Sequence, residues 1–254
     1  GDCNTLSGML SHGQNVVIWG PPKSGKMSVV RQTLFNLRTS GHTPVLCEVD
    51  LLNIRTPEAF LRRFAGNVIK SVAAAPGEMG EISSAFLGDT SLAFDENLYL
   101  ETGELFQGSF PLSEEESREI IELPYRLAES RKTDVIVVIR EFQNIGTDEG
   151  DRILRVMQDV LASHKDAPAP YCSFVLLGAR VNAMADIFSR RKLFWNVVER
   201  LALSPLTSTE IAEYVMRGFS MGGKVIDREL VQGVCNLFRN NVWHINHFFF
   251  ICDC

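Results

Sequence analysis

No stretch of this 254-residue sequence approaches the 18 or so continuous apolar residues that a membrane span requires. A basic-then-apolar leader and a sustained disorder signature are also missing from it. Lys and Arg number 25 against 31 Asp and Glu, so the chain as a whole gives no electrostatic argument for binding nucleic acid or an anionic membrane. These absences predict a cytoplasmic protein without membrane association.

Cysteine is sparse and does not follow the spacing of a metal site. Cys252 and Cys254 form a C-x-C at the end of the sequence, but no second Cys or His pair lies nearby to complete four ligands. Two of the other four cysteines lie in apolar runs, where a free thiol behaves as a small hydrophobic side chain. We therefore expect a reducing compartment and predict no metal bound by cysteine.

The length allows one large domain, or a domain of roughly 200 residues with a small appendage. Five short apolar runs without polar alternation are typical of strands buried on both faces, and helical patterns separate them. The predicted strands are 15–19, 43–49, 134–139, 173–177 and 201–203, and the predicted helices are 26–37, 57–72, 114–130 and 149–163. This alternation predicts an α/β fold with a parallel sheet between two helical layers.

Residues 73–112 interrupt the alternation, with five glycines and little periodicity. We interpret them as an insertion that contains short helices. From residue 206 onward the pattern is wholly helical, over 207–219, 227–238 and 243–251. Thr207 and Glu210 have the spacing of a capping box at the start of this part. We predict a core of residues 1–205 and a helical appendage of residues 206–254.

A candidate phosphate-binding motif lies between the first predicted strand and the first predicted helix. It has the spacing G-x-x-x-x-G-K and consists of Gly20, Pro21, Pro22, Lys23, Ser24, Gly25, Lys26, Met27 and Ser28. Such a turn directs backbone N–H groups and the positive end of a helix at an anion, while the lysine reaches the terminal phosphates. The alternative is a chance glycine-rich turn in which Lys26 only caps the helix.

Three further segments follow in an order that one family shares. Residues 139–143 read Ile-Arg-Glu-Phe-Gln, residues 174–180 read Phe-Val-Leu-Leu-Gly-Ala-Arg, and residues 199–206 read Glu-Arg-Leu-Ala-Leu-Ser-Pro-Leu. With the motif at 20–28, they resemble the Walker A, Walker B, sensor and lid segments of P-loop ATPases of the AAA+/STAND branch, in particular archaeal-type ATPases. The resemblance implies a sheet in the order 5-1-4-3-2, a helical lid, and ATP or ADP as the ligand.

The sequence departs from this family at both metal anchors. In P-loop ATPases Mg²⁺ is held by the Ser or Thr after the lysine and by the Walker B Asp, and here these positions are Met27 and Arg140. A thioether is a poor ligand for Mg²⁺, and a guanidinium cannot bind it. Ser28 and Glu141, one residue further on, are expected to face away. Arg140 either turns away from the site or takes the place of the metal against phosphate. Ala179 also replaces the small polar residue that relatives place after the sensor strand.

The resemblance assigns roles to three other side chains. Glu141 corresponds to the acid that polarises the attacking water, and its alternative is an exposed acid at a strand end. Arg180 is a candidate sensor. Arg200 is a candidate arginine finger for the γ-phosphate, and its alternative is a surface salt bridge.

Residues 248–252 form a dense apolar run, Phe-Phe-Phe-Ile-Cys, close to the end of the sequence. One interpretation is a last helix packed on the lid. Because members of the family often continue into a winged-helix module, the alternative is that the run docks such a module, a partner chain or a missing remainder of this chain.

These observations predict an ATP-binding protein of the AAA+/STAND type that acts as a nucleotide switch with weak or absent hydrolysis, because the losses fall on metal and sensor positions. Its expected partner is a protein or a second copy, bound through the lid and the apolar run. Nucleic acid is not expected without a winged helix. The alternative function is an interaction scaffold that keeps the fold but no longer binds nucleotide.

Overall fold

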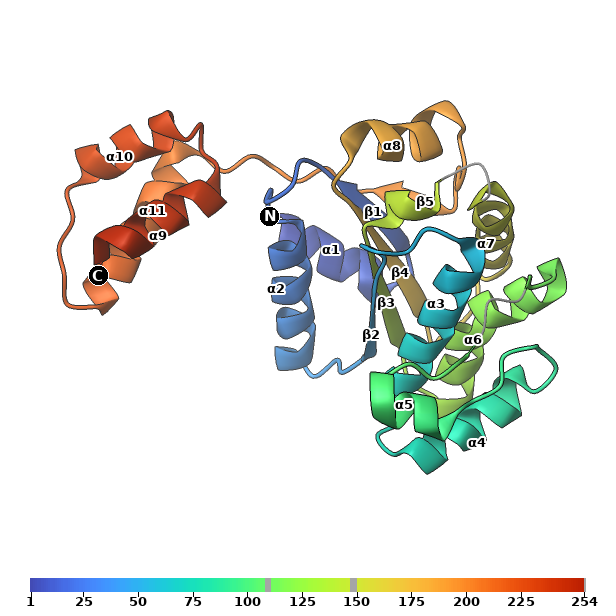
Figure 1. The fold of residues 1–254 in the computed structure, drawn as a ribbon. Helices are drawn as coiled ribbons and strands as arrows, with labels where there is room; N and C mark the ends of the chain where they lie inside the picture. The colour runs from blue at the N-terminus through green and yellow to red at the C-terminus, as the bar shows by residue number, and fades with distance from the viewer. Residues whose placement is uncertain (108–110, 147–149, 254) are drawn as a thin grey trace.

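Five parallel strands form a single sheet in the order β2-β3-β4-β1-β5 in the computed structural model, which describes residues 1–107, 111–146 and 150–253 (Figure 1). The strands are β1 Asn15–Trp19, β2 Val45–Asp50, β3 Val135–Arg140, β4 Cys172–Gly178 and β5 Val198–Arg200. This is the predicted order 5-1-4-3-2 counted from the other edge, so the α/β class and the order are confirmed. β4, which carries the sensor-like segment, lies between β1 and β3.

The fifth strand lies earlier in the chain than predicted. We expected it at 201–203, whereas the strand that pairs with β1 is Val198–Arg200. The amide of Leu201 still donates a hydrogen bond to the Val17 carbonyl (3.0 Å), but the pairing ends there. Leu201 and Leu203 pack against a hydrophobic cluster on one face of the sheet, which explains why the sequence is apolar at these positions although they lie outside the strand.

Helices cover both faces of the sheet. α1 Asp2–Ser11 and α2 Lys26–Thr39 lie on one face, and α3 Pro57–Val72, α6 Glu114–Arg131 and α7 Asp151–Ser163 lie on the other. The helices predicted at 26–37, 57–72 and 114–130 are confirmed. Residue 149, where the fourth was expected to begin, lies outside the described residues. α1 was not predicted, because only Leu6 and Leu10 among its residues are buried and its apolar periodicity is sparse.

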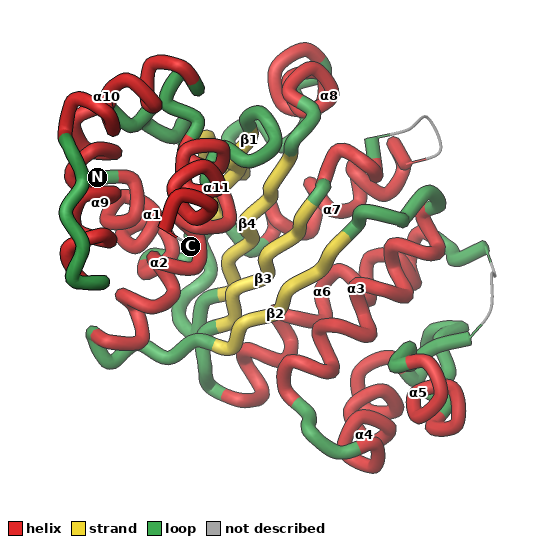
Figure 2. The backbone as a smooth tube through the Cα atoms, turned by 60° about the vertical axis from the view of Figure 1, so that its left-hand side comes forward, coloured by secondary structure: helices red, strands yellow, loops and turns green. Residues whose placement is uncertain are grey.

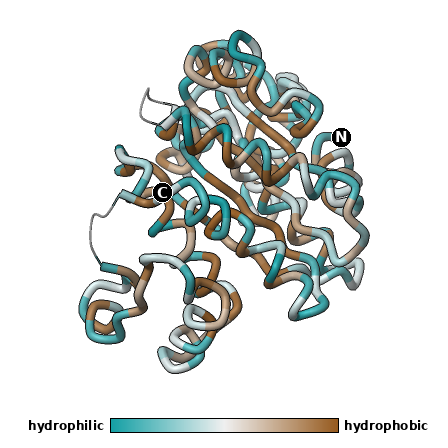
Figure 3. Tube along the Cα trace, turned by 90° about the vertical axis from the view of Figure 1, so that its right-hand side faces the viewer, coloured by the Kyte–Doolittle hydropathy of each residue, from teal (hydrophilic) through white to brown (hydrophobic). Residues whose placement is uncertain are grey.

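The central strands are buried on both sides, and alternate residues serve different clusters. Val17 and Val137 belong to the cluster beneath α3, α6 and α7, whereas Ile18 and Val138 belong to the one beneath α1 and α2. This period of two explains why the runs read as continuous apolar segments. Figure 3 shows the same arrangement, with the hydrophobic strands inside and hydrophilic residues on the outer helices.

The segment 73–112 contains two short helices, α4 Pro76–Leu87 and α5 Glu96–Thr102, as we interpreted it. Residues 108–110 of this segment lie outside the described residues. Pro76 begins α4, where its missing N–H is not needed, and the Asp95 side chain caps α5 by accepting from the Leu98 amide (3.0 Å). Leu87 and Leu105 are fully or almost fully buried in the cluster that includes α3.

Three helices follow the sheet: α9 Ser208–Met221, α10 Arg228–Leu237 and α11 Val242–Asp253. They share a hydrophobic cluster of their own, and an extended segment joins them to β5 (Figure 1). The capping box at Thr207 and Glu210 is present, with the Glu210 amide donating to the Thr207 hydroxyl (3.2 Å). Among the helices of the described residues, none has both the length and the apolar character needed to cross a membrane.

Glu116 joins the start of α6 to the segment that follows α4. Its carboxylate accepts hydrogen bonds from the amides of Ser113 (2.7 Å) and Ser91 (2.7 Å) and from the Ser91 hydroxyl. The hydrogen bond from the Ser91 hydroxyl, followed by the one from the Ser113 amide, lowers the pKa of Glu116 from 4.5 to about 2.

Replacing Glu116 by Gln is expected to remove a pH-dependent part of the stability. Because the folded pKa is depressed, this part is fully present above the usual pKa of 4.5 and is lost as the pH falls toward about 2. Urea unfolding across this range should show the wild type more stable than Glu116→Gln near neutral pH, with the difference closing in acid. Glu115→Gln, in the same helical turn, is the control. A difference between Glu116→Gln and the wild type that does not change with pH would contradict the assignment.

Candidate functional site

The loop between β1 and α2 has the backbone geometry of a phosphate-binding turn. The Gly20 amide donates a hydrogen bond to the Gly178 carbonyl (3.3 Å), which ties the loop to the end of β4. Gly25 precedes α2 with φ +83°, a left-handed conformation that disfavours a side chain. The first N–H groups of α2 have no partner within the helix and carry its positive end. Residues 21–25 are exposed, so a ligand can reach them.

Lys26 turns back onto the loop. Its ammonium donates hydrogen bonds to the carbonyls of Gly20 (2.8 Å) and Pro21 (2.7 Å) and to the Ser24 hydroxyl (3.1 Å). Desolvation by partial burial lowers the pKa of Lys26, and the negative charge of Glu141 opposes this shift. The cation therefore lies among the oxygens of the loop, where its hydrogen bonds stabilise the turn.

Glu141 lies at the turn that ends β3, with φ +56°. Its carboxylate accepts a hydrogen bond from the Gln143 amide nitrogen (2.7 Å), and the Gln143 amide oxygen accepts one from the Ala179 backbone (3.3 Å). Gln143 is only 6% exposed, so this amide links the end of β3 to the end of β4 inside the protein. We gave Gln143 no role from the sequence, although it stands in the Walker B-like motif.

Arg140 points to the neighbouring strand β2. Its guanidinium lies 3.1 Å from the Asp50 carboxylate, and the two residues are opposite each other in the parallel pairing. β2 lies on the far side of β3 from β1, so Arg140 is directed away from the loop. Asp50 was not among our candidates, although it directly follows the strand predicted at 43–49. Parallel strands end at the same edge of a sheet, and this was the available signal.

The other expected metal-anchor position, Met27, has apolar surroundings. Met27 packs against the cluster formed with α1 and α2, and Ser28 is exposed. Neither the Met27 thioether nor the Arg140 guanidinium offers Mg²⁺ an oxygen ligand. Within the part of the chain that the structure describes, no three His, Cys, Asp or Glu side chains are grouped as metal ligands.

The two candidate arginines lie on different elements near this edge. Arg180 is exposed and precedes α8 Val181–Ala185, and its side chain makes no hydrogen bond or ion pair with any described residue. Arg200 ends β5, and its guanidinium carbon lies 3.9 Å from the centre of the Trp19 ring. Because Trp19 directly precedes Gly20, Arg200 lies beside the start of the loop, and a cation–π contact holds it there.

The loop also contacts the C-terminal helices. The Lys23 ammonium lies 3.0 Å from the centre of the Trp243 ring, which belongs to α11. Trp243 in turn stacks on His247, with ring centres 5.4 Å apart. Figure 1 and Figure 2 both place the C-terminal helices on the side of the molecule where α1 and α2 lie. No sequence pattern predicted this contact, since Lys23 was expected to contribute only its backbone.

Comparison with known proteins identifies the fold. No protein-family model matches this sequence, and neither does any curated protein. A Walker-type ATPase of Pyrococcus abyssi matches over 96% of this chain and 64% of its own, with 19% identity and a TM-score of 0.58. The ADP form of the ORC2 protein of Aeropyrum pernix matches over 99% and 61%, with 13% identity and a TM-score of 0.53. Cdc6p from Pyrobaculum aerophilum matches over 91% and 52%, with 14% identity and a TM-score of 0.50.

These likenesses show the fold alone, an α/β fold like that of P-loop NTPases, with the five-stranded parallel sheet described above. At such identities they do not carry activity from one chain to another. The chain spans about half to two thirds of the length of the structures that it matches.

The Arg140–Asp50 ion pair is expected to contribute little stability, because the side chains are 42% and 37% exposed and water screens their attraction. In a double-mutant cycle of Arg140→Gln and Asp50→Asn, followed by urea unfolding, the coupling free energy should stay below about 1 kcal/mol. A coupling above about 2 kcal/mol would show instead that the edge of the sheet depends on this pair.

Proposed function

We propose that the chain binds ATP or ADP at residues 20–28 and acts as a nucleotide-dependent switch with weak or absent hydrolysis. The observation that carries the proposal is the loop itself, with a left-handed Gly25 and a central Lys26 between a buried strand and a helix. The helix end, the free N–H groups and the ammonium are all suited to a polyphosphate. The AAA+ type of fold and the motif order favour adenine nucleotides, as does the P. abyssi Walker-type ATPase among the similar structures.

We further propose that binding does not need Mg²⁺ held in the usual way. Met27 packs against apolar side chains, and Arg140 pairs with Asp50, so two oxygen ligands are missing from the place where P-loop enzymes hold the metal. Glu141 remains near Lys26, where it would act on the attacking water. Hydrolysis is expected to be slow, because no metal neutralises the charge that develops on the phosphates.

The three C-terminal helices are proposed to act as a lid that responds to the nucleotide. Residues 1–205 would then be the nucleotide-binding core and residues 206–254 the lid. The contact between Lys23 and Trp243 supports this, because it joins the phosphate loop directly to α11. A nucleotide that moves Lys23 would change how the lid is held.

A protein partner, or a second copy of the chain, is proposed to bind the lid in the cytoplasm. Phe249 is buried in the cluster of the lid, whereas Leu237, Met221 and Ile251 are 70%, 85% and 62% exposed. The apolar run at 248–252 therefore packs partly inward and partly offers apolar surface. We propose neither a membrane nor a nucleic acid as the partner.

The second candidate function is an interaction scaffold that binds no nucleotide. One observation favours it: Lys26 already has three hydrogen-bond acceptors within its own loop, so the turn is satisfied without a ligand.

Thermal unfolding with ATP separates these two functions. At 100 times its dissociation constant, ATP should add about 2.7 kcal/mol and raise the midpoint by about 5 to 10 °C for a chain of this size. The shift should persist in EDTA and vanish in Lys26→Ala, because the ammonium meets the phosphates. Lys165→Ala, an exposed lysine elsewhere, is the matched control. No shift under any condition would leave the scaffold as the function, and a shift that requires Mg²⁺ would overturn the metal-independent mode.

Supplying oxygen ligands at the two anchors should create a dependence on Mg²⁺. In the double variant Met27→Thr and Arg140→Asp, the midpoint shift with ATP is expected to be larger with Mg²⁺ than with EDTA, because a hydroxyl and a carboxylate then occupy the two positions from which P-loop enzymes hold the metal. Met27→Leu with Arg140→Met is the control that adds no oxygen. If the Thr/Asp variant responds to Mg²⁺ no better than this control, the two positions are not the missing anchors.

A further inference from the structure

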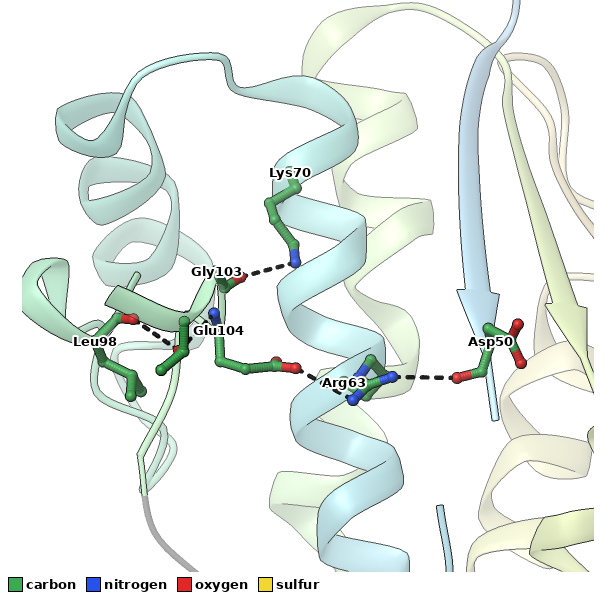
Figure 4. A network of polar contacts seen from close by, with 7 residues as sticks. Asp50, Arg63, Lys70, Leu98, Gly103 and Glu104 are labelled. Carbon is green, nitrogen blue, oxygen red and sulfur yellow. Dashed lines mark hydrogen bonds and ion pairs between the residues drawn. The ribbon is translucent and has the colours of Figure 1, made fainter. Parts of the chain in front are cut away.

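A polar cavity lies along the outer edge of β2, and strands β3 and β4 separate β2 from β1, the strand that precedes the phosphate loop. Its volume is about 470 Å³. β2 forms one wall, α3 forms the second, residues 102–104 after α5 form the third, and Arg140 closes one end. Figure 4 shows side chains of α3 reaching both the strand and the segment after α5. A cavity of this volume accommodates a small metabolite.

The backbone of β2 offers hydrogen-bonding groups to this cavity. The Leu51 amide donates to the Arg140 carbonyl (3.1 Å) on β3. Along a parallel strand, the backbone groups of successive residues point alternately to the two neighbouring sides. The N–H and C=O groups of Glu48 and Asp50 therefore point away from β3, toward the cavity. The Asp50 carbonyl indeed accepts from Arg63 on α3 (3.4 Å). The backbone N–H and C=O of Glu48 have no strand partner, because among the described residues no strand pairs with the outer edge of β2.

Two ion pairs account for four of the six charged side chains that line the cavity. Arg63 lies 3.2 Å from the carboxylate of Glu104, and Arg140 lies 3.1 Å from that of Asp50. Each pair joins two walls of the cavity, as Figure 4 shows for Arg63 and Glu104. Together these four side chains add no net charge.

The remaining two charged groups, Lys70 and Glu48, have no ion-pair partner among residues 1–107, 111–146 and 150–253. The Lys70 ammonium donates one hydrogen bond, to the Gly103 carbonyl (3.1 Å). Desolvation lowers the pKa of Lys70, the charge of Glu104 opposes this shift, and Arg63 adds to it. The cavity therefore presents one half-buried ammonium that would gain from an anion, and one exposed carboxylate that would gain from a cation.

We propose that this cavity binds a free α-amino acid, with its carboxylate on Lys70 and its ammonium on Glu48. A ligand with both charges matches both unpaired groups and leaves the cavity neutral. The outward N–H and C=O of Glu48 provide further bonds for the two ends of the same ligand. A simple anion such as phosphate would leave Glu48 without a counter-charge, and a simple cation would leave Lys70 without one. The rest of the volume receives the side chain of the amino acid.

The test is binding of each proteinogenic L-amino acid to the full chain, screened by thermal unfolding and measured by calorimetry. At least one is expected to bind saturably with one site per chain. Two analogues of the best binder, one lacking the α-amino group and one lacking the α-carboxylate, should each bind at least about tenfold more weakly, because each loses a charge-assisted hydrogen bond.

Variants locate the site. Lys70→Met and Glu48→Gln should each weaken binding by about tenfold or more, whereas Lys165→Met and Glu129→Gln, at exposed positions elsewhere, should leave it unchanged. Glu48 is exposed, so its variant tests the site even if Lys70→Met fails to fold. Lys26→Ala should also leave amino-acid binding unchanged, which separates this proposal from nucleotide binding.

Three results would overturn the proposal. They are no binding by any of the amino acids, equal binding of the analogue without the α-amino group, which would indicate a plain anion site, and binding that neither Lys70→Met nor Glu48→Gln weakens.

Discussion

The parallel alignment of β1, β4 and β3, with both faces buried, is the constraint on which the rest of this structure depends. Parallel strands end at one edge, so the loop after β1, the Glu141 turn after β3 and Ala179 after β4 meet there. Two hydrogen bonds connect these ends, from the Gly20 amide to the Gly178 carbonyl and from the Ala179 amide to Gln143. Because the strands are held by packing above and below, the edge can carry polar groups that the core does not need for its stability.

Charge at this edge is distributed between two separate places. Lys26 and Glu141 lie near the loop, whereas Arg140, one residue before Glu141, pairs with Asp50 at the end of the edge strand β2. β3 ends at Arg140 and the chain turns at Glu141, with φ +56°, so these two neighbours in sequence have different surroundings. Arg140 therefore contributes its ion pair with Asp50 to the cavity beside β2 and offers no oxygen ligand to the loop.

The C-terminal helices are coupled to the loop by aromatic and cationic side chains rather than by a shared core. Their hydrophobic cluster is separate from the two clusters of the sheet, and Lys23 meets Trp243 across the boundary. A single cation–π contact contributes much less free energy than a packed interface. A contact this weak is compatible with the lid movement that we propose, since only a small free energy opposes the separation of Lys23 from Trp243.

The sequence by itself determined the class of the fold, the order of the strands through the family resemblance, and the position of the glycine-containing loop between β1 and α2. These depend on patterns between residues close in the chain, such as the apolar runs, the spacing of Gly20, Gly25 and Lys26, and the capping box at Thr207. The shift of β5 to Val198–Arg200 was missed because pairing with β1, and not apolar character, decides where an edge strand lies. Only the tertiary structure decided the partner of Arg140, the contact of Lys23 with Trp243 and the cavity around Lys70. Each of these joins residues far apart in the sequence, and local periodicity carries no information about which distant side chains the packing of helices on the sheet brings together.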